Sequence, residues 1–307
     1  MLNYSYLLVV FLLFTNIACV KASTKNSIRD YKKELSLNYI SETLENYEVK
    51  DYNIVAINSS KQLIKLLKDN KLWKLETNEI SHILIKNFPS DFRKLRVQDK
   101  KRAFFHSMIS MILVVSREIK NERAKFIAIS NKYNLISDFN KKNIESLKLS
   151  DKLFIARITK KYKATKKSEL LKRIDVLPIS LILSQTAIES AWGTSRFTVQ
   201  GNNLFGVWSF NGKGLIPLRR KKGLKHRVAI YDSLLDSVRD YMLKINTVRA
   251  YRKLRNLRVY SKNSIYLTRG LLHYSERKQA YVKDLQKMIK RNKLKKYDNL
   301  HLKAGKI

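Results

Sequence analysis

The sequence has little cysteine, proline and glycine, and each shortage excludes a class of protein. Cys19 is the one cysteine in 307 residues, which excludes a disulfide scaffold and a zinc site built from cysteines. Three prolines and eight glycines exclude collagen-like and linker-like chains. Hydrophobic residues make up 44% of the chain, which is sufficient for a buried core. The composition therefore predicts a folded protein with one large domain or two small ones.

Acidic side chains are also scarce. The chain has 63 lysines and arginines against 25 aspartates and glutamates, so its formal net charge is +38. Such a charge predicts an anionic partner, which is nucleic acid, a lipid surface or an anionic polymer of the cell envelope. A nucleic-acid binder would show a steep dependence of binding on salt. The abundance of Lys, Asn and Ile is also typical of an AT-rich genome, so codon usage stays an alternative source of the lysine excess.

The N-terminal segment predicts export. Residues 6–20 are almost wholly apolar and precede the first charged side chain, Lys21. This run is shorter than the about 20 residues that a membrane helix needs, and it suits the hydrophobic region of a secretory signal cleaved before Ser23. An uncleaved membrane anchor and lipid attachment at Cys19 stay open as alternatives. We expect a periplasmic or cell-envelope protein that meets the membrane only through an uncleaved N-terminal segment and binds no nucleic acid.

Apolar residues recur at helical spacing in the first half of the chain. Residues 59–67 predict a short helix capped by serine. A break follows at 89–91, and a long amphipathic helix is predicted from Lys100 through Ile119. The polar stretch 138–150 is a candidate domain boundary.

Glycine placement points to a functional region in the second half. The first 192 residues contain no glycine, and all eight glycines follow from Gly193 onward. Glycine serves turns and close approaches of the backbone to a ligand. Residues 193–223 therefore predict an irregular, aromatic-bearing loop region, of the kind that carries functional sites on a rigid scaffold.

Glu189 is the strongest candidate for a catalytic group. Pro178 is suited to the first position of a helix, and Gly193 is suited to its end, which puts Glu189 in the last turn. The negative end of the helix dipole and apolar neighbours both raise the pKa of a carboxyl, as a general acid requires. At helical spacing, Gln185 and Trp192 share the face of Glu189 and suit a sugar. An ordinary surface glutamate at a helix end is the alternative.

Four motifs carry a resemblance to a known family. Residues 177–195 (LPISLILSQTAIESAWGTS) resemble the signature of the lysozyme-like glucosaminidases, glycoside hydrolase family 73. Residues 201–206 (GNNLFG), 231–233 (YDS) and 274–277 (YSER) are similar to later motifs of that family. The match is closest to the bacterial Bax-type proteins and covers roughly residues 84–297.

The resemblance implies a mainly α, lysozyme-like glucosaminidase domain with a small irregular or β lobe and an N-terminal helical extension. It implies cleavage of β-1,4 bonds in peptidoglycan strands next to N-acetylglucosamine, with Glu189 as the catalytic acid and Tyr274 near the scissile bond. No cofactor and no metal are implied. We expect a signal peptide, an N-terminal helical region, a glucosaminidase domain and a basic tail, at residues 1–22, 23–145, 146–297 and 298–307.

A second catalytic carboxylate is not evident in the sequence. Glycosidases usually carry two carboxyls about 5–9 Å apart, yet no Asp or Glu lies between Ser190 and Tyr231. Asp232 is one candidate for the second acid, with helix capping as the alternative. Glu276 is another, with a structural ion pair as the alternative. Attack by the N-acetyl group of the substrate itself would need no second carboxylate, with Tyr274 orienting that group.

Further residues are candidates for substrate binding. Phe205 and Trp208 suit stacking on sugars, with core packing as the alternative. Asn202 and Asn203 suit hydrogen bonds to acetamido groups, although turn formation explains them equally well. Tyr231 joins them through its motif. A non-catalytic peptidoglycan-binding module of the same fold stays open as an alternative function, as do muramidase and amidase specificities.

Overall fold

The computed structural model describes residue 52 and residues 54–304, apart from 136–143, 145, 210–212, 219, 221–222 and 224. The chain divides into two compact units, Met1–Tyr52 and Asn53–Ile307. The predicted signal peptide and Cys19 lie outside the described residues. Within the described part of the chain, no helix has both the length and the apolar content needed to cross a membrane.

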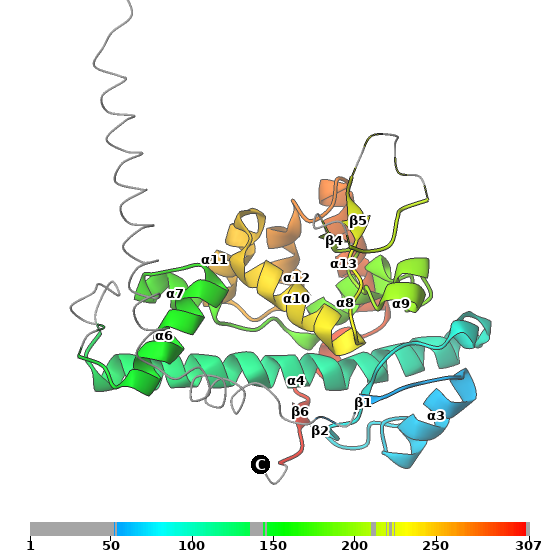
Figure 1. The fold of residues 1–307 in the computed structure, drawn as a ribbon. Coiled ribbons are helices and arrows are strands. Elements are labelled where there is room, and N and C mark those ends of the chain that lie inside the picture. The colour runs from blue at the N-terminus through cyan, green and yellow to red at the C-terminus, as the bar shows by residue number, and fades with distance from the viewer. Residues whose placement is uncertain are drawn as a thin grey trace, which may run out of the picture. The chain divides into compact units, whose positions relative to one another are not determined.

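The second unit is mainly α-helical, as predicted (Figure 1). Its α-helices are α3 (Ser60–Asp69), α4 (Val97–Lys132), α6 (Leu149–Tyr162), α7 (Lys167–Arg173), α8 (Ile179–Glu189), α9 (Arg196–Gly201), α10 (Leu234–Thr247), α11 (Arg252–Tyr260), α12 (Ser264–Leu267) and α13 (Lys278–Arg291). Four 3₁₀ helices accompany them, η1 (Ser90–Lys94), η2 (Arg249–Tyr251), η3 (Thr268–Leu271) and η4 (Leu294–Tyr297).

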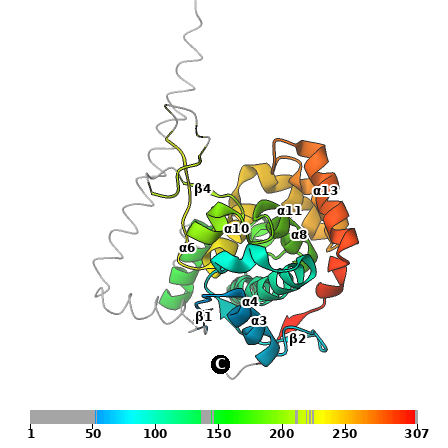
Figure 2. The same cartoon turned by 90° about the vertical axis from the view of Figure 1, so that its right-hand side faces the viewer.

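The long helix α4 supports the rest of the unit. It starts before the predicted Lys100 and extends beyond Ile119, over 36 residues. Residues 103–116 of α4 are all buried, because α8 and α10 pack on one side and α3 on another. Figures 1 and 2 show α4 running under the helices of the C-terminal half. The predicted helical extension thus shares a core with the second half of the chain.

Helix α8 lies at the centre of that core. Its residues from Ile179 to Ala187 are all buried, and it contacts α4, α12, α13 and η4. A helix that is apolar on every side is stable only when it is covered on every side. Its first turn is fixed by Asp298, which accepts hydrogen bonds from the backbone N–H and the hydroxyl of Ser180, both at 2.8 Å.

Strands are short and occur in pairs. β1 (Ile54–Val55) pairs in parallel with β3 (Leu84–Ile85), and β2 (Glu79–Ile80) pairs in parallel with β6 (His301–Leu302). The segment predicted as a basic tail therefore contributes a strand. The third pair is antiparallel, between β4 (Trp208–Ser209) and β5 (Arg227–Val228), with an isolated bridge from Leu215 to Val228. This pair lies in the region predicted as an irregular or β lobe, although that region also contains helix α9.

Buried arginines fix α11 to the ends of neighbouring helices. Arg258 is 0% exposed. It donates to the carbonyl oxygen of Lys172, in the last turn of α7, at 2.8 Å, and to that of Asp175, just after α7, at 2.9 Å. Arg255 donates to the carbonyl oxygens of Ile245 and Val248 at the end of α10, at 2.9 and 2.8 Å. These bonds satisfy carbonyl groups that lack partners inside their own helices. Burial lowers the pKa of both guanidinium groups to about 10, where they remain cationic at neutral pH.

Candidate active site around Glu189

Glu189 is the last residue of α8 and so lies in the last turn, where the sequence predicts it. Its side chain is half-buried, and burial raises the pKa of its carboxyl above the ordinary value. A hydrogen-bond interaction with the Tyr281 hydroxyl lowers that pKa and is the smaller effect. The carboxyl therefore keeps its proton to a higher pH than an exposed glutamate does.

Four tyrosines surround Glu189, namely Tyr241 of α10, Tyr251 of η2, Tyr274 and Tyr281 of α13. Burial raises the pKa of each, and the nearby charge of Glu189 raises it further. The rings of Tyr274 and Tyr281 stack at 5.4 Å with an interplanar angle of 3°, and the rings of Tyr251 and Tyr274 are 5.7 Å apart. All four hydroxyls remain protonated donors at neutral pH, in a partly dry setting beside the acid.

Gln185 is buried under these tyrosines. Its side chain is 0% exposed. Its Oε1 accepts a hydrogen bond from the Tyr241 hydroxyl, and its Nε2 donates to the Tyr281 hydroxyl at 3.3 Å. The helical spacing correctly predicts that Gln185 lies on the face of Glu189. In this position it holds two tyrosines in place, and its contact with substrate stays a prediction.

Trp192 lies off the helical face that the spacing predicts. The helix ends at Glu189, and the φ angles of Ala191 and Trp192 are +48° and +61°. The helix thus ends two residues earlier than a glycine at 193 in the C′ position predicts. The Trp192 ring packs edge-on against Phe104 and Phe105 of α4, with centroid distances of 5.9 and 5.1 Å.

The two asparagines of the second motif hold the β lobe to the helices. Asn203 is 1% exposed, and its Nδ2 donates to the carbonyl oxygens of Val207 and Ala229, both at 2.9 Å. Asn202 Nδ2 donates to the carbonyl oxygen of Tyr231 at 3.1 Å. These bonds favour the alternative of turn formation over contact with acetamido groups.

The aromatic candidates divide between core and surface. Phe205 is buried and stacks on Tyr241 at 3.9 Å with an interplanar angle of 10°. Its carbonyl oxygen accepts a bond from the Tyr274 hydroxyl at 3.5 Å, so the GNNLFG segment contacts the tyrosine cluster. Trp208 is 51% exposed and lies against His226. The Tyr231 hydroxyl donates to Asp240 on α10.

Neither candidate for the second acid is linked to Glu189. The causes of the raised pKa of Glu189 are burial and Tyr281, and neither is a carboxylate. Asp232 is exposed, and the helix cap is its neighbour Ser233, whose hydroxyl accepts from the backbone N–H of Asp236. Glu276 is exposed and forms no ion pair with another residue that the structure describes, so the alternative of a structural ion pair gains no support.

The described residues contain no group of three or more His, Cys, Asp or Glu side chains that could hold a metal ion. His106 is buried instead in the core, with Nδ1 2.7 Å from the carbonyl oxygen of Leu72. Burial lowers the pKa of His106 to about 4.

Sequence reasoning missed Tyr241, Tyr251 and Tyr281 as parts of the site. Tyr281 stands seven residues after Tyr274 on the following helix, and Tyr241 lies on the buried stripe of α10, so both look like core residues in the sequence. Tyr251 lies in a 3₁₀ turn that no motif marks. Their common feature, proximity to Glu189, exists only in three dimensions.

Comparisons with known proteins agree with the resemblance. Residues 164–294 match the Glucosaminidase family, described as mannosyl-glycoprotein endo-beta-N-acetylglucosaminidase. The chain is 35% identical over 89 residues to Protein bax of Escherichia coli (strain K12), a segment that covers 29% of this chain and 31% of that protein. The chain thus spans less than a third of the length of this curated relative.

Two solved structures are also similar. The catalytic domain of the autolysin Auto from Listeria monocytogenes is 25% identical, with a TM-score of 0.34, over 50% of this chain and 90% of that chain. A peptidoglycan hydrolase from Sphingomonas sp. A1 is 18% identical, with a TM-score of 0.32, over 50% and 92%. Residues 164–294 are therefore similar to the Glucosaminidase family, and a segment of 89 residues is similar to Protein bax.

Proposed function

We propose that this protein is an exported peptidoglycan hydrolase that cleaves β-1,4 glycosidic bonds next to N-acetylglucosamine. The observation that carries the proposal is the half-buried carboxyl of Glu189, with its raised pKa, inside a glucosaminidase-family domain. A glycosidase must protonate the leaving oxygen, and a carboxyl that keeps its proton to higher pH does this best. Glu189 is the general acid.

The reaction proceeds without a second protein carboxylate. Glu189 donates its proton to the glycosidic oxygen while the carbonyl oxygen of the substrate's N-acetyl group attacks the anomeric carbon and displaces that oxygen. Water then attacks the same carbon, the bond to the acetamido oxygen breaks, and the Glu189 carboxylate takes the proton of the water. Two observations support this route over the two that need a second protein carboxylate. No Asp or Glu lies between Ser190 and Tyr231, and no carboxylate is among the causes of the raised pKa of Glu189.

The surrounding tyrosines orient the reacting groups. The Tyr281 hydroxyl, held by Gln185 Nε2 at 3.3 Å, fixes the Glu189 carboxyl. The Tyr274 hydroxyl makes only a long bond of 3.5 Å to the Phe205 carbonyl, so it can turn to the acetamido group at small cost. Tyr274 therefore orients the N-acetyl group or stabilises the positive charge that develops on the sugar ring.

Export depends on the apolar segment 6–20. Fusion of residues 1–22 to alkaline phosphatase, which is active only outside the cytoplasm, tests this part of the proposal. We expect phosphatase activity from the fusion and none from a version in which Leu12 and Leu13 are changed to arginine. Activity of both versions, or of neither, would contradict a signal in this segment.

The activity is tested by digestion of isolated peptidoglycan with the purified protein. Released fragments are reduced with borohydride, and their ends are identified by mass spectrometry. We expect reduced N-acetylglucosamine ends from wild type and from D232N and E276Q, and none from E189Q. Reduced N-acetylmuramic acid ends would contradict the named bond and leave the hydrolase class intact.

The same experiment distinguishes the hydrolase from a non-catalytic peptidoglycan-binding module. A non-catalytic binding module would release no fragments and would still sediment with peptidoglycan. Loss of activity in D232N or E276Q, with the folded state retained as judged by circular dichroism, would contradict the route without a second carboxylate.

A further inference from the structure

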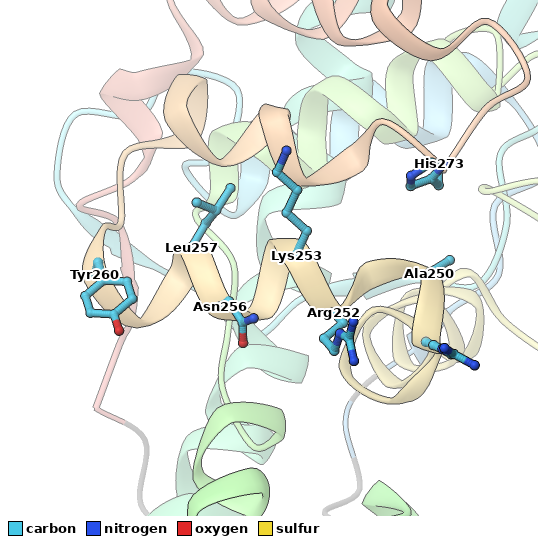
Figure 3. Close-up of a pocket in the computed structure, with 8 residues that line it drawn as sticks. Ala250, Arg252, Lys253, Asn256, Leu257, Tyr260 and His273 are labelled. Carbon is cyan, nitrogen blue, oxygen red and sulfur yellow. The ribbon is translucent and has the colours of Figure 1, made fainter.

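A groove runs along the outer face of α11, beyond the tyrosine cluster. It has a volume of about 510 Å³, and its lining includes Arg249, Arg252, Lys253, Leu257 and Tyr260 from η2 and α11. Figure 3 shows Arg252, Lys253, Leu257 and Tyr260 along α11 and His273, from the segment after η3, on the opposite side. Volumes of this order accommodate small ligands or short parts of a polymer.

The groove is strongly cationic. None of its lining residues is acidic, and Arg249, Arg252 and Lys253 form no ion pair within the part of the chain that the structure describes. Arg255 and Arg258, on the inner face of the same helix, donate hydrogen bonds to backbone carbonyl oxygens. Among the residues that the structure describes, the outer cations therefore have no acidic partner, and a guanidinium fork suits an oxyanion.

The walls of the groove are held rigidly. A Cβ added at Gly270 would lie 2.4 Å from the Cα of Leu254, so η3 approaches the backbone of α11 as closely as only glycine permits. The inner arginines fix α11 from its other side. A preformed site loses little conformational entropy when a ligand binds.

Residues that line the groove are next in sequence to two tyrosines of the candidate active site. Ala250 and Arg252 line the groove, and Tyr251 between them interacts with the charge of Glu189. His273 lines the groove, and the next residue, Tyr274, also interacts with Glu189. The Tyr251–Tyr274 pair is thus the partition between the acid and the cationic groove.

We propose that this groove binds carboxylate groups of the peptide that peptidoglycan carries beside its glycan strand, while the strand itself lies at Glu189. The inference rests on the proposed function, because that function brings a polymer with peptide carboxylates to the partition. Tyr260, which is 85% exposed, and Leu257 supply apolar surface for the peptide stem. Arg249, Arg252 and Lys253 bind its carboxylates.

The test measures binding, so that its outcome does not depend on cleavage. The protein is the full chain with E189Q, and three soluble ligands are titrated by calorimetry. These are a disaccharide with its peptide, the same compound with every carboxyl amidated, and the disaccharide without peptide. We expect the carboxylate form to bind roughly tenfold more tightly than the other two, as for two or three partly exposed ion pairs.

Two sets of substitutions assign the preference to the groove. R249Q/R252Q/K253Q should abolish the preference for the carboxylate form. K61Q/K68Q/K120Q removes the same charge from exposed positions on α3 and α4 and should retain the preference. Equal binding of the carboxylate and amidated forms, or a preference that survives the groove substitutions, would overturn the inference.

The failure of this inference and the failure of the proposed function give different results. If wild type cleaves peptidoglycan but shows no carboxylate preference, the inference about the groove is wrong and the proposed hydrolase activity stands. If wild type cleaves nothing but shows a carboxylate preference that depends on the groove, the proposed hydrolase activity is wrong and the inference about the groove stands.

Discussion

The two sides of the Tyr251–Tyr274 pair use polar groups in opposite ways. On the inner side, Glu189 is half-buried among tyrosines, and burial raises the pKa of its carboxyl. On the outer side, Arg249, Arg252 and Lys253 are exposed and have no acidic neighbour in the lining of their groove. The difference indicates that the two regions have different roles. The half-buried region sets the protonation of Glu189, and the exposed region supplies positive charge for binding an anionic ligand.

The largest expected effect is on catalysis, from a substitution of Glu189 on the inner side. E189Q should reduce hydrolysis of peptidoglycan by about 10²–10⁴-fold, the contribution of a positioned general acid. The rate of release of soluble fragments measures it, and E276Q is the matched control at an exposed position.

The stability of E189Q provides an independent check. Because burial raises the folded-state pKa of Glu189 above its unfolded value, its ionisation lowers stability as pH rises through the folded pKa, and this cost is absent below the unfolded pKa. Glutamine does not ionise. E189Q should therefore be no less stable than wild type at neutral pH, and a marked fall in its melting temperature would show that Glu189 is a structural residue.

The next largest effect is on stability, from a substitution of Arg258, which holds α11 and its outer face in place. R258M removes the bonds to the carbonyls of Lys172 and Asp175 and leaves the Asp175 carboxylate without its buried partner. We expect a loss of about 3 kcal/mol in the free energy of unfolding. R252M, on the outer face of the same helix, should cost less than about 0.5 kcal/mol. Similar losses for the two variants in urea denaturation would contradict the distinction between the faces of α11.

A smaller effect is expected from G270A. The added methyl group would meet the backbone of Leu254 at 2.4 Å, and we expect a loss of about 1–3 kcal/mol from overpacking. Because η3 and α11 must separate to relieve the contact, the carboxylate preference of the groove should fall as well. A variant with wild-type stability and wild-type preference would show that this close approach does not shape the groove.

The smallest effect changes the pH dependence alone. The Tyr281 hydroxyl lowers the pKa of Glu189, so Y281F should raise that pKa further. A general acid works while it is protonated, and the alkaline limb of the pH–rate profile should therefore move to higher pH. Y266F, at a tyrosine outside the cluster, is the control. A shift of the limb to lower pH would contradict the assignment of this limb to Glu189.

The sequence predicted the helix of Glu189 and much of the architecture for physical reasons. Pro178, an apolar run and a glycine soon after define a buried helix, and the absence of glycine before Gly193 correctly locates the irregular region in the second half. The end of the helix was not predictable, because Ala191 and Trp192 adopt positive φ angles that their residue types do not favour.

The remainder of the site depends on packing between distant segments. Tyr251 and Tyr281 reach Glu189 from elements far along the chain, and their sequence neighbours give no signal of it. Asn203 shows the converse case, because an asparagine typical of sugar recognition has its amide engaged by Val207 and Ala229. The close approach of Gly270 to the backbone of Leu254 is likewise a contact that no local pattern predicts.

The most direct test of the central claim is the configuration of the new reducing end, observed by proton NMR in the first minutes of digestion. Attack by the N-acetyl group followed by attack of water inverts the anomeric carbon twice, so we expect the β-anomer to appear first. First appearance of the α-anomer would require a single displacement by water with a base opposite Glu189, and it would contradict a mechanism in which Glu189 is the one catalytic carboxylate.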